Sequence, residues 1–414
     1  MVSALFIIYF VPLQKIKTIR IMKSTILSAI CCMLMFCACH DEKEEWPRET
    51  GRAVLVYMAA DNNLDNEVRS DLSEMIEGSK MLGDEAKLIA LVDRRRERPY
   101  ILEIANGDTI RRETFDEELS TSSAETLRTA MHWLTDHYQA KSYGLVLWGH
   151  ADGWIIYDDQ PKQEARRRGY GIDYTAGSTW MNITDMARVL GDFPRLTFIF
   201  ADCCAFMSVE SMYELRGVAD YIIGSPAEIP AEGAPYQTVV PQLFNEDERF
   251  YERIADAYFA QVTYDSCREP LSVVKTSEME RLAAATREVL ASFVPTLPDS
   301  RYPDVGGLIY YYKHTLYDMN DVIMAHAAPD NYTTWREALD AAVVYKTFTD
   351  HWRARFVAFM DFYVTEQRYG GLNMYVPQDA SYLPMKYVDT ALRQDATIHL
   401  MQWYQAAGYR ELGW

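Results

Sequence analysis

The amino-acid sequence predicts an α/β fold, in which a mostly parallel sheet is flanked by helices, followed by a mainly helical C-terminal subdomain. Two observations predict the sheet: continuous apolar runs of strand length, and helical segments that alternate with them along the chain. A third observation predicts the subdomain, because the helical pattern dominates after about residue 275. We therefore assign residues 51–275 to the α/β domain and residues 276–414 to the C-terminal subdomain.

Each predicted strand is a short apolar run, as expected for a strand that is covered on both faces. These runs are Ala53–Ala60, Lys87–Val92, Tyr143–Trp148, Leu196–Ala201 and Tyr221–Gly224. Helical spacing separates them at Leu64–Ile76, at Ala124–Tyr138 and up to Leu215. The C-terminal half is expected to hold a helix over Ser277–Val294, more helical packing in the tyrosine-rich segments 310–312, 335–345 and 352–363, and a late strand at Leu372–Val376.

The first forty residues differ in composition from the rest of the chain. They carry basic residues but no acidic one, and they include the apolar run Ile26–Ala38, a pattern typical of a secretory signal rather than a membrane-spanning helix. The run ends in a sequence that resembles a bacterial lipobox, which makes Cys39 the expected lipidation site; a plain cleaved signal is the alternative. We predict a signal over residues 1–39, with Met22 as a possible natural start, and an acidic tether over residues 40–50.

Charge and the expected signal together constrain partners and location. The formal net charge is −19, which argues against nucleic acid as a partner and fits a basic ligand, although a solvated acidic surface explains it equally well. An exported bacterial lipoprotein on the periplasmic or cell-surface side of the outer membrane is expected. Contact with the membrane would then run through the lipid anchor only.

Three of the seven cysteines lie beyond the signal, at Cys203, Cys204 and Cys267. They are too few for a disulfide framework in a chain of this length. Each is therefore either a buried small hydrophobe or a reactive thiol.

Reactive side chains follow two of the predicted strands directly. His150 comes after the third strand and Cys204 after the fourth, and side chains at the carboxyl ends of parallel strands gather at one edge of the sheet. A thiol becomes nucleophilic only as the thiolate, and a nearby histidine and a helix N-terminus both favour that form. Gly149 and Gly153 allow the backbone to approach a substrate carbonyl closely, as an oxyanion site requires.

The spacing of these residues leads to a resemblance. His150 precedes Cys204 by 54 residues, close to the ~50 of caspase-type peptidases. Four segments, in order, resemble the clostripain family of cysteine peptidases, which shares a caspase-like fold with gingipains, legumains and caspases. They are Val56–Leu64, Leu147–Trp154, Asp202–Leu215 and Gly371–Pro377.

The resemblance implies roles for individual residues. His150 and Cys204 would be the catalytic pair of a peptidase that cleaves after Arg or Lys, with Asp202 in the specificity pocket and Glu232 as a second acid there. Gly149 and Ala151 would belong to the oxyanion site. This chain departs from the family in having Cys203 where alanine is usual, and Gly149 and Ala151 around the histidine, which leaves full activity open.

The same resemblance implies that the chain cuts itself between the two active segments. The polar stretch 161–169 has the composition of an exposed loop. Cleavage is expected there after a basic residue, the candidates being Lys162, Arg166, Arg167 and Arg168.

Other functions are weaker readings of the same residues. A catalytically degenerate surface-binding lipoprotein is the main alternative, and a redox module built on the vicinal cysteines is a remote one. No metal ligand set is expected and no cofactor is needed; calcium dependence occurs in clostripain, but no loop here alternates oxygen ligands as a calcium site would. The expected partners are proteins or peptides that contain Arg or Lys.

Overall fold

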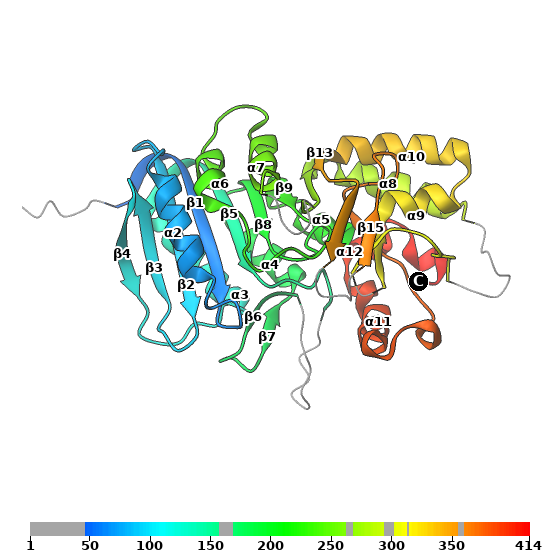
Figure 1. The fold of residues 1–414 in the computed structure, drawn as a ribbon, viewed down its shortest axis with the longest axis horizontal. Coiled ribbons are helices and arrows are strands. Elements are labelled where there is room, and N and C mark those ends of the chain that lie inside the picture. The colour runs from blue at the N-terminus through cyan, green and yellow to red at the C-terminus, as the bar shows by residue number, and fades with distance from the viewer. Residues whose placement is uncertain (1–45, 157–168, 262–267, 294–301, 313, 355–359) are drawn as a thin grey trace, which may run out of the picture. The chain divides into compact units, whose positions relative to one another are not determined.

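A computed structural model of the chain describes residues 46–156, 169–261, 268–293, 302–312, 314–354 and 360–414. The segment Pro47–Trp414 forms one compact unit (Figure 1). Cys39, the predicted signal, Cys267 and the candidate cleavage residues Lys162 and Arg166–Arg168 lie outside the described residues.

The centre of this unit is a nine-stranded sheet in the order β13-β10-β9-β8-β5-β1-β2-β3-β4. Its five middle strands, from β9 to β2, are parallel, and antiparallel strands extend the sheet at both edges. The strands are β1 (Arg48–Ala60), β2 (Ala86–Arg94), β3 (Tyr100–Ala105), β4 (Asp108–Thr114), β5 (Tyr138–Gly149), β8 (Leu196–Asp202), β9 (Ala219–Gly224), β10 (Leu271–Lys275) and β13 (Val343–Thr347). The predicted α/β class, with a parallel sheet core, is confirmed.

Helices cover both faces of the sheet. On one face α2, α6 and α7 share a single apolar core with alternate residues of β1 and β2. On the other, α3 contacts β1 and β5 and packs on α4, which packs on α5. The bounds are α2 (Val68–Ser79), α3 (Ala124–His137), α4 (Ile183–Leu190), α5 (Val209–Leu215), α6 (Tyr236–Leu243) and α7 (Phe250–Phe259).

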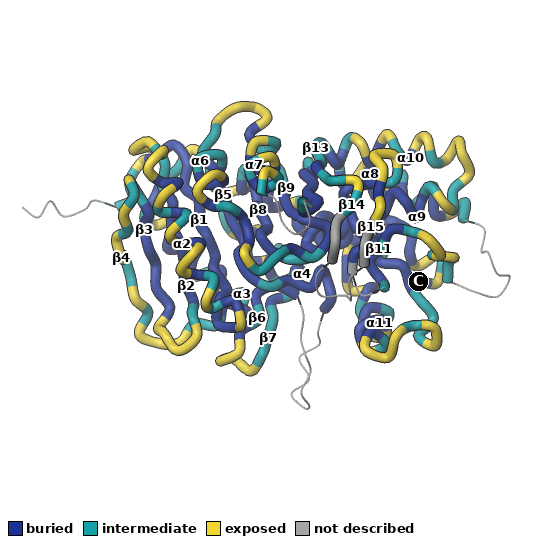
Figure 2. Tube along the Cα trace, viewed as in Figure 1, coloured by how far each residue is buried: buried dark blue, intermediate teal, exposed yellow. Residues whose placement is uncertain are grey.

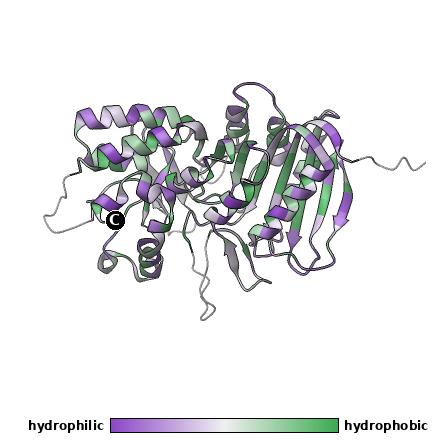
Figure 3. Ribbon diagram, turned by 180° about the vertical axis from the view of Figure 1, so that it is seen from behind, coloured by the Kyte–Doolittle hydropathy of each residue, from purple (hydrophilic) through white to green (hydrophobic). Residues whose placement is uncertain are grey.

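Burial explains why the predicted strands were readable in the sequence. Every residue from Ala53 to Ala60 is fully buried, so β1 is an uninterrupted apolar run. Figure 2 shows the middle strands as buried and the edge strand β4 as largely exposed. Figure 3 shows the middle strands as the most hydrophobic part of the unit. The edge strand β4 carries mostly polar residues, which hid it in the sequence. Its neighbour β3 is a short buried apolar run that the sequence analysis did not single out.

The C-terminal part contains the expected helices but more strands than expected. Its helices are α8 (Met279–Leu290), α9 (Met319–His326), α10 (Pro329–Ala342), α11 (Met385–Thr397) and α12 (Gln402–Ala406). The tyrosine-rich segment near residue 310 was predicted to be helical but forms a short strand, and the described ends of the segment 352–363 are strands as well. The strands of this part outside the central sheet are β11 (Tyr310–Tyr312), β12 (Leu316–Asp318), β14 (His351–Ala354), β15 (Met360–Tyr363) and β16 (Asn373–Tyr375). Strands this short span too few residues to show a period of two.

One further hairpin lies beside the central sheet. It consists of β6 (Tyr170–Asp173) and β7 (Thr179–Met181). Its first strand contacts β1 and β5 near their carboxyl ends, and the Tyr170 hydroxyl donates to the backbone oxygens of Tyr57 and Trp148 at 2.9 and 3.1 Å. The hairpin is therefore fixed at the edge of the sheet where the reactive residues were expected.

Candidate active site

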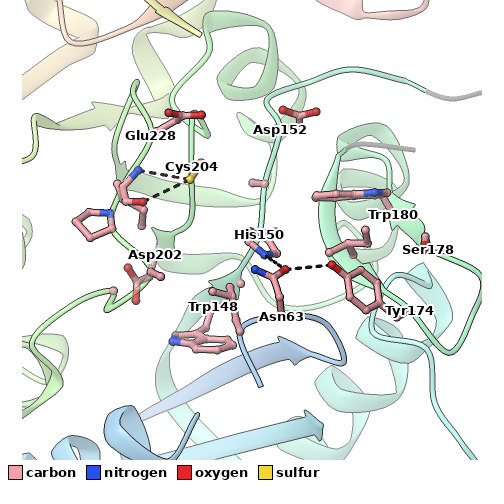
Figure 4. A pocket seen from close by; sticks show the side chains of 18 residues that line it. Asn63, Trp148, His150, Asp152, Tyr174, Ser178, Trp180, Asp202, Cys204 and Glu228 are labelled. Atoms are coloured by element: carbon pink, nitrogen blue, oxygen red, sulfur yellow. Dashed lines mark hydrogen bonds between the residues drawn. The ribbon is translucent and has the colours of Figure 1, made fainter. Parts of the chain in front are cut away.

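The register of the sheet brings His150 and Cys204 to the same edge. Strands β5 and β8 are parallel neighbours, and Trp148 of β5 pairs with Asp202 of β8. His150 and Cys204 each follow two residues after that pair, so both strands deliver their reactive side chain at one level. Both side chains line one cavity (Figure 4). The sequence-predicted pair is thus brought together by the tertiary structure.

That cavity has a volume of about 610 Å³, within the range of small-ligand sites. Its walls come from the loop after β1, the end of β5, the β6–β7 hairpin, the end of β8 and the segment after β9. The lining residues are Asn63, Leu64, Trp148, Gly149, His150, Ala151, Asp152, Ile172, Tyr174, Ser178, Trp180, Asp202, Cys204, Glu228, Ile229, Pro230, Ala231 and Gly233. Three of these described residues are acidic and none is Lys or Arg, so the cavity favours a cationic ligand.

The imidazole of His150 is held by Asn63. His150 Nε2 lies 2.9 Å from Asn63 Oδ1, and the same oxygen accepts the Tyr174 hydroxyl at 3.1 Å (Figure 4). An amide oxygen can only accept, so Nε2 carries the proton and Nδ1 is the ring nitrogen that can receive one. Burial lowers the pKa of His150, while Asp152 raises it. Asn63 is a residue that the sequence analysis did not single out, although it lies inside the matched segment Val56–Leu64.

The sulfur of Cys204 is paired with backbone. The Ile229 amide donates to Cys204 Sγ at 3.4 Å, and Sγ lies 3.8 Å from the Ile229 carbonyl oxygen. Burial raises the pKa of Cys204 to about 12, and the charges of Glu228 and Asp152 add to that rise. The pair is therefore a neutral thiol and a neutral imidazole at rest, and proton transfer between them must accompany attack on a substrate.

The neighbouring Cys203 has a different environment. It is fully buried, and burial raises its pKa well above the ordinary value. Cys204 is partly exposed to the cavity. Of the two vicinal thiols, Cys204 is the one that a substrate can reach.

Asp202 is a buried carboxylate with one oxygen satisfied and one not. Its Oδ2 accepts the Ala234 amide at 3.0 Å and the Tyr236 hydroxyl at 2.8 Å, whereas its buried Oδ1 has no hydrogen-bond partner among the residues that the structure describes. The close packing of Asp202 requires a glycine at position 233. A Cβ there would lie 2.8 Å from Oδ2, and the φ of +60° also favours glycine. Burial raises the pKa of Asp202 to about 6, against the two hydrogen bonds, which lower it.

A second buried acid contacts Trp148 of the cavity wall and has a different protonation state. Asp71 of α2 accepts the Trp148 Nε1–H at 2.5 Å. Its pKa is raised to about 8, first by burial and then by the charge of Asp202. At neutral pH Asp71 is therefore mostly protonated and Asp202 mostly ionised, so Asp202 is the charged member of this pair.

Of the other predicted site residues, two line the cavity and one does not. Gly149 and Ala151 line the cavity beside His150. Gly149 has a φ of +145°, and a Cβ there would lie 2.9 Å from the Ala59 carbonyl oxygen, so glycine is required. Ala151 is not in a positive-φ conformation, so its methyl group creates no backbone strain. Glu232 is exposed and is not among the lining residues, whereas Glu228, four residues earlier, is.

The loop that carries Cys204 is buttressed by the C-terminal part. Ala205 has a φ of +50°, unusual for a residue with a side chain, and its amide donates to Ala227 at 2.7 Å. Asn373 of β16 extends this support, because its amide donates to Met207 at 3.0 Å and its Nδ2 donates to Pro226 at 2.8 Å. The matched segment Gly371–Pro377 therefore has a physical role, which is to hold both loops around the sulfur.

Within the described ranges, no group of three or more His, Cys, Asp or Glu side chains is arranged to hold a metal ion. Among the helices of the same residues, none is long and apolar enough to cross a membrane.

A thiol and an imidazole at adjacent parallel strand ends, facing an acidic cavity, define a cysteine hydrolase. Comparison with known proteins gives the family. The model of the clostripain family of peptidases matches residues 56–405, and the chain belongs to that family of cysteine proteases. No curated protein sequence matches it.

Two solved structures are similar over nearly the whole of their chains. A secreted cysteine protease of this family from Bacteroides thetaiotaomicron, in complex with an irreversible peptide inhibitor, is 28% identical with a TM-score of 0.73, and the match covers 87% of this chain and 99% of that one. An inactive zymogen protease of the family from Parabacteroides distasonis is 29% identical with a TM-score of 0.71, covering 88% and 99%. These similarities confirm the predicted family and fold.

Proposed function

We propose that the protein is an endopeptidase that cleaves after Arg or Lys, with Cys204 as nucleophile and His150 as general base. The observation that carries the proposal is the buried Oδ1 of Asp202, which finds no partner in the described part of the chain and belongs to a residue that lines the cavity of Cys204. A buried carboxylate oxygen without a partner is costly, and a guanidinium or ammonium group from a substrate would supply the missing donor.

The proposed reaction uses the observed proton arrangement. His150 Nδ1 accepts the thiol proton while Cys204 Sγ bonds to the carbonyl carbon, and backbone amides near Gly149 and Ala151 stabilise the oxyanion. The tetrahedral intermediate collapses to a thioester as the imidazolium gives its proton to the leaving amine. Water, deprotonated by His150, then hydrolyses the thioester and releases the free thiol.

The first experiment compares wild type with Cys204→Ala and Cys203→Ala on peptides that differ only at the residue before the cut bond. Cys204→Ala should lose at least about 10³-fold in kcat/KM, and Cys203→Ala should stay within about threefold because its sulfur does not reach the cavity. Preference for Arg or Lys over Ala supports the proposed specificity. Cleavage that is indifferent to that residue, or lost equally in both variants, contradicts the proposal.

We also propose autoprocessing within residues 160–170, after Lys162 or one of Arg166–Arg168. The hairpin that begins at Tyr170 carries Tyr174 and Trp180 of the cavity wall, so a cut just before it would change how one wall of the cavity is tethered. Mass spectrometry of purified wild type should show a cut in this interval that is missing in Cys204→Ala. An intact wild-type chain that cleaves an Arg peptide would refute autoprocessing while leaving the peptidase proposal intact.

Export and lipid anchoring at Cys39 form a further proposal, supported by the signal-like composition of residues 1–39. Metabolic labelling with a palmitate analogue should mark wild type and not Cys39→Ala, and protease treatment of intact cells would distinguish the cell surface from the periplasm.

We propose that the peptidase needs no cofactor. Chelation with EGTA should change kcat/KM by less than about twofold. A loss of activity that calcium restores would overturn this proposal.

One observation favours the alternative of a binding protein without activity. The Cys204 sulfur accepts a hydrogen bond from the Ile229 amide, and the pKa of about 12 leaves little thiolate at neutral pH. An Arg-containing, thiol-reactive affinity probe separates the two functions. Labelling that disappears in Cys204→Ala supports the peptidase, whereas tight reversible binding of Arg peptides without labelling supports the binding protein.

A further inference from the structure

Acidic side chains lie on both sides of the Cys204 sulfur, and only one side is explained by the proposed specificity. Figure 4 shows Asp202 on one side of Cys204, with Glu228 and Asp152 on the other. All three line the same cavity. They come from three separate segments, the end of β8, the segment after β9 and the residues after His150, so no local sequence run produces the arrangement.

The position of Glu228 and Asp152 relative to the sulfur is fixed by backbone contacts. Glu228 directly precedes Ile229, whose amide donates to Cys204 Sγ at 3.4 Å. Asp152 lies two residues after His150, and its amide donates to the Gly169 carbonyl oxygen at 2.9 Å. Asp152 is 1% exposed, so its carboxylate is held in the wall. Both carboxylates raise the pKa of the Cys204 thiol, which places them within electrostatic range of it.

A peptide bound for cleavage must place its scissile carbonyl at this sulfur. Successive side chains of an extended peptide point in opposite directions. If the basic side chain before the cut bond reaches Asp202, a side chain next to it points to the opposite side of Cys204. There it meets Glu228 and Asp152, whose negative charge attracts a cation and repels an acid.

We infer that Glu228 and Asp152 form a second cationic subsite, and that the preferred substrates carry two adjacent basic residues at the cleavage point. This inference rests on the proposed function, because it takes the side chain at Asp202 to be Arg or Lys. The interval in which autocleavage is proposed has this composition, with three consecutive arginines at 166–168.

The test uses internally quenched peptides with Arg before the cut bond. The residue two places before the bond, or the one just after it, is varied between Arg, Ala and Glu. Wild type should cleave the dibasic peptide at least about tenfold better than the Ala peptide, and the varied position with the larger effect identifies the subsite. Glu228→Gln and Asp152→Asn should each reduce this ratio by about threefold or more.

Two further variants control the interpretation. Glu248→Gln removes the same charge from an exposed acidic residue outside the cavity, and it should leave the ratio unchanged. Glu228→Lys should invert the preference toward Glu at the varied position, a result that a merely misfolded variant cannot give.

The outcomes separate the two proposals. If wild type cleaves Arg peptides but the dibasic ratio is near one, or if the ratio survives in both Glu228→Gln and Asp152→Asn, the second subsite is wrong and the peptidase proposal stands. If wild type does not prefer Arg or Lys before the cut bond, the proposed specificity fails first, and the subsite inference fails with it.

Discussion

Two aspartates in different parts of the molecule share burial and acidity but differ in their hydrogen bonds. Asp202 at the end of β8 and Asp318 at the start of α9 are both buried, and burial raises the pKa of each to about 6. Both oxygens of Asp318 are bonded, to the Tyr311 hydroxyl at 2.6 Å and to the amides of Asp321 and Gly370 at 2.9–3.1 Å. Asp202, by contrast, has one oxygen that no described residue bonds.

The difference shows how a binding carboxylate can be told from a structural one. Asp318 caps a helix and joins it to a neighbouring loop, so its contacts are complete within the fold. Asp202 is held by Ala234 and Tyr236 through one oxygen only. A buried carboxylate oxygen that lacks a partner among the described residues points to a ligand when its residue also lines a cavity, and Asp202 meets both conditions. The same residue type at similar burial therefore completes a hydrogen-bond network in one place and, in the proposed function, binds the substrate in the other.

The largest expected effect is on substrate recognition. Asp202→Asn should lower kcat/KM for Arg peptides by at least about 100-fold, because it removes the charge that would meet the guanidinium group. Its melting temperature should change by only a few degrees, since the charge is costly to bury in the free protein. Equal losses on Arg and Ala peptides would show that Asp202 acts on folding or chemistry and not on recognition.

Asn63 and Asn320 form a second pair in which one residue acts at the candidate active site and the other in the fold. Asn63→Ala should lower kcat by about tenfold with little change in KM, because His150 loses the acceptor that fixes its tautomer. Asn320, whose side chain is bonded to Gln367, Arg368, Tyr332 and Arg336, is the matched control. Asn320→Ala should reduce stability and leave kcat per folded molecule near wild type. A change in KM alone for Asn63→Ala would contradict the positioning role.

Inhibitor binding and protein stability should depend on pH in opposite directions. A competitive alkylguanidine inhibitor should bind about tenfold more weakly for each pH unit below about 6, as Asp202 becomes protonated. Stability should respond in the opposite sense. Folding raises the pKa of Asp202 and Asp318 above the unfolded value, so the folded state holds more protons, and their contribution to stability grows as pH falls from 7 toward 4. Inhibitor binding that is flat between pH 5 and 7 would exclude Asp202 as the guanidinium partner.

The smallest effect on activity is expected at the structural aspartate. Asp318→Asn replaces an acceptor with an amide donor facing the Gly370 amide and the Tyr311 hydroxyl, so thermal unfolding should shift down by several degrees. Activity per folded molecule on Arg peptides should stay within about twofold of wild type. A large loss of Arg preference in this variant would remove the contrast with Asp202.

The central sheet could be predicted from the sequence because its middle strands are buried. Strands β1, β2, β5, β8 and β9 are buried on both faces, and such strands appear as apolar runs. The edge strand β4 was missed because it is polar and partly exposed, and the short strands near residues 310, 352 and 362 were missed because they are too short to show a period. The tyrosine-rich segments were therefore read as helical. The sequence analysis also overlooked β3, although it is a buried apolar run.

The sequence by itself determined that His150 and Cys204 each directly follow a buried strand, and residues at the carboxyl ends of parallel strands emerge at the same edge of a sheet. The tertiary structure decided that these two strands are neighbours. Only the tertiary structure decided which side chains meet them there. It placed Glu228 rather than Glu232 in the cavity wall and brought Asn63 to the imidazole. Within the described ranges it also left one oxygen of Asp202 without a hydrogen bond. Loop side chains have no periodic direction, so their orientation is set by contacts between segments far apart in the chain.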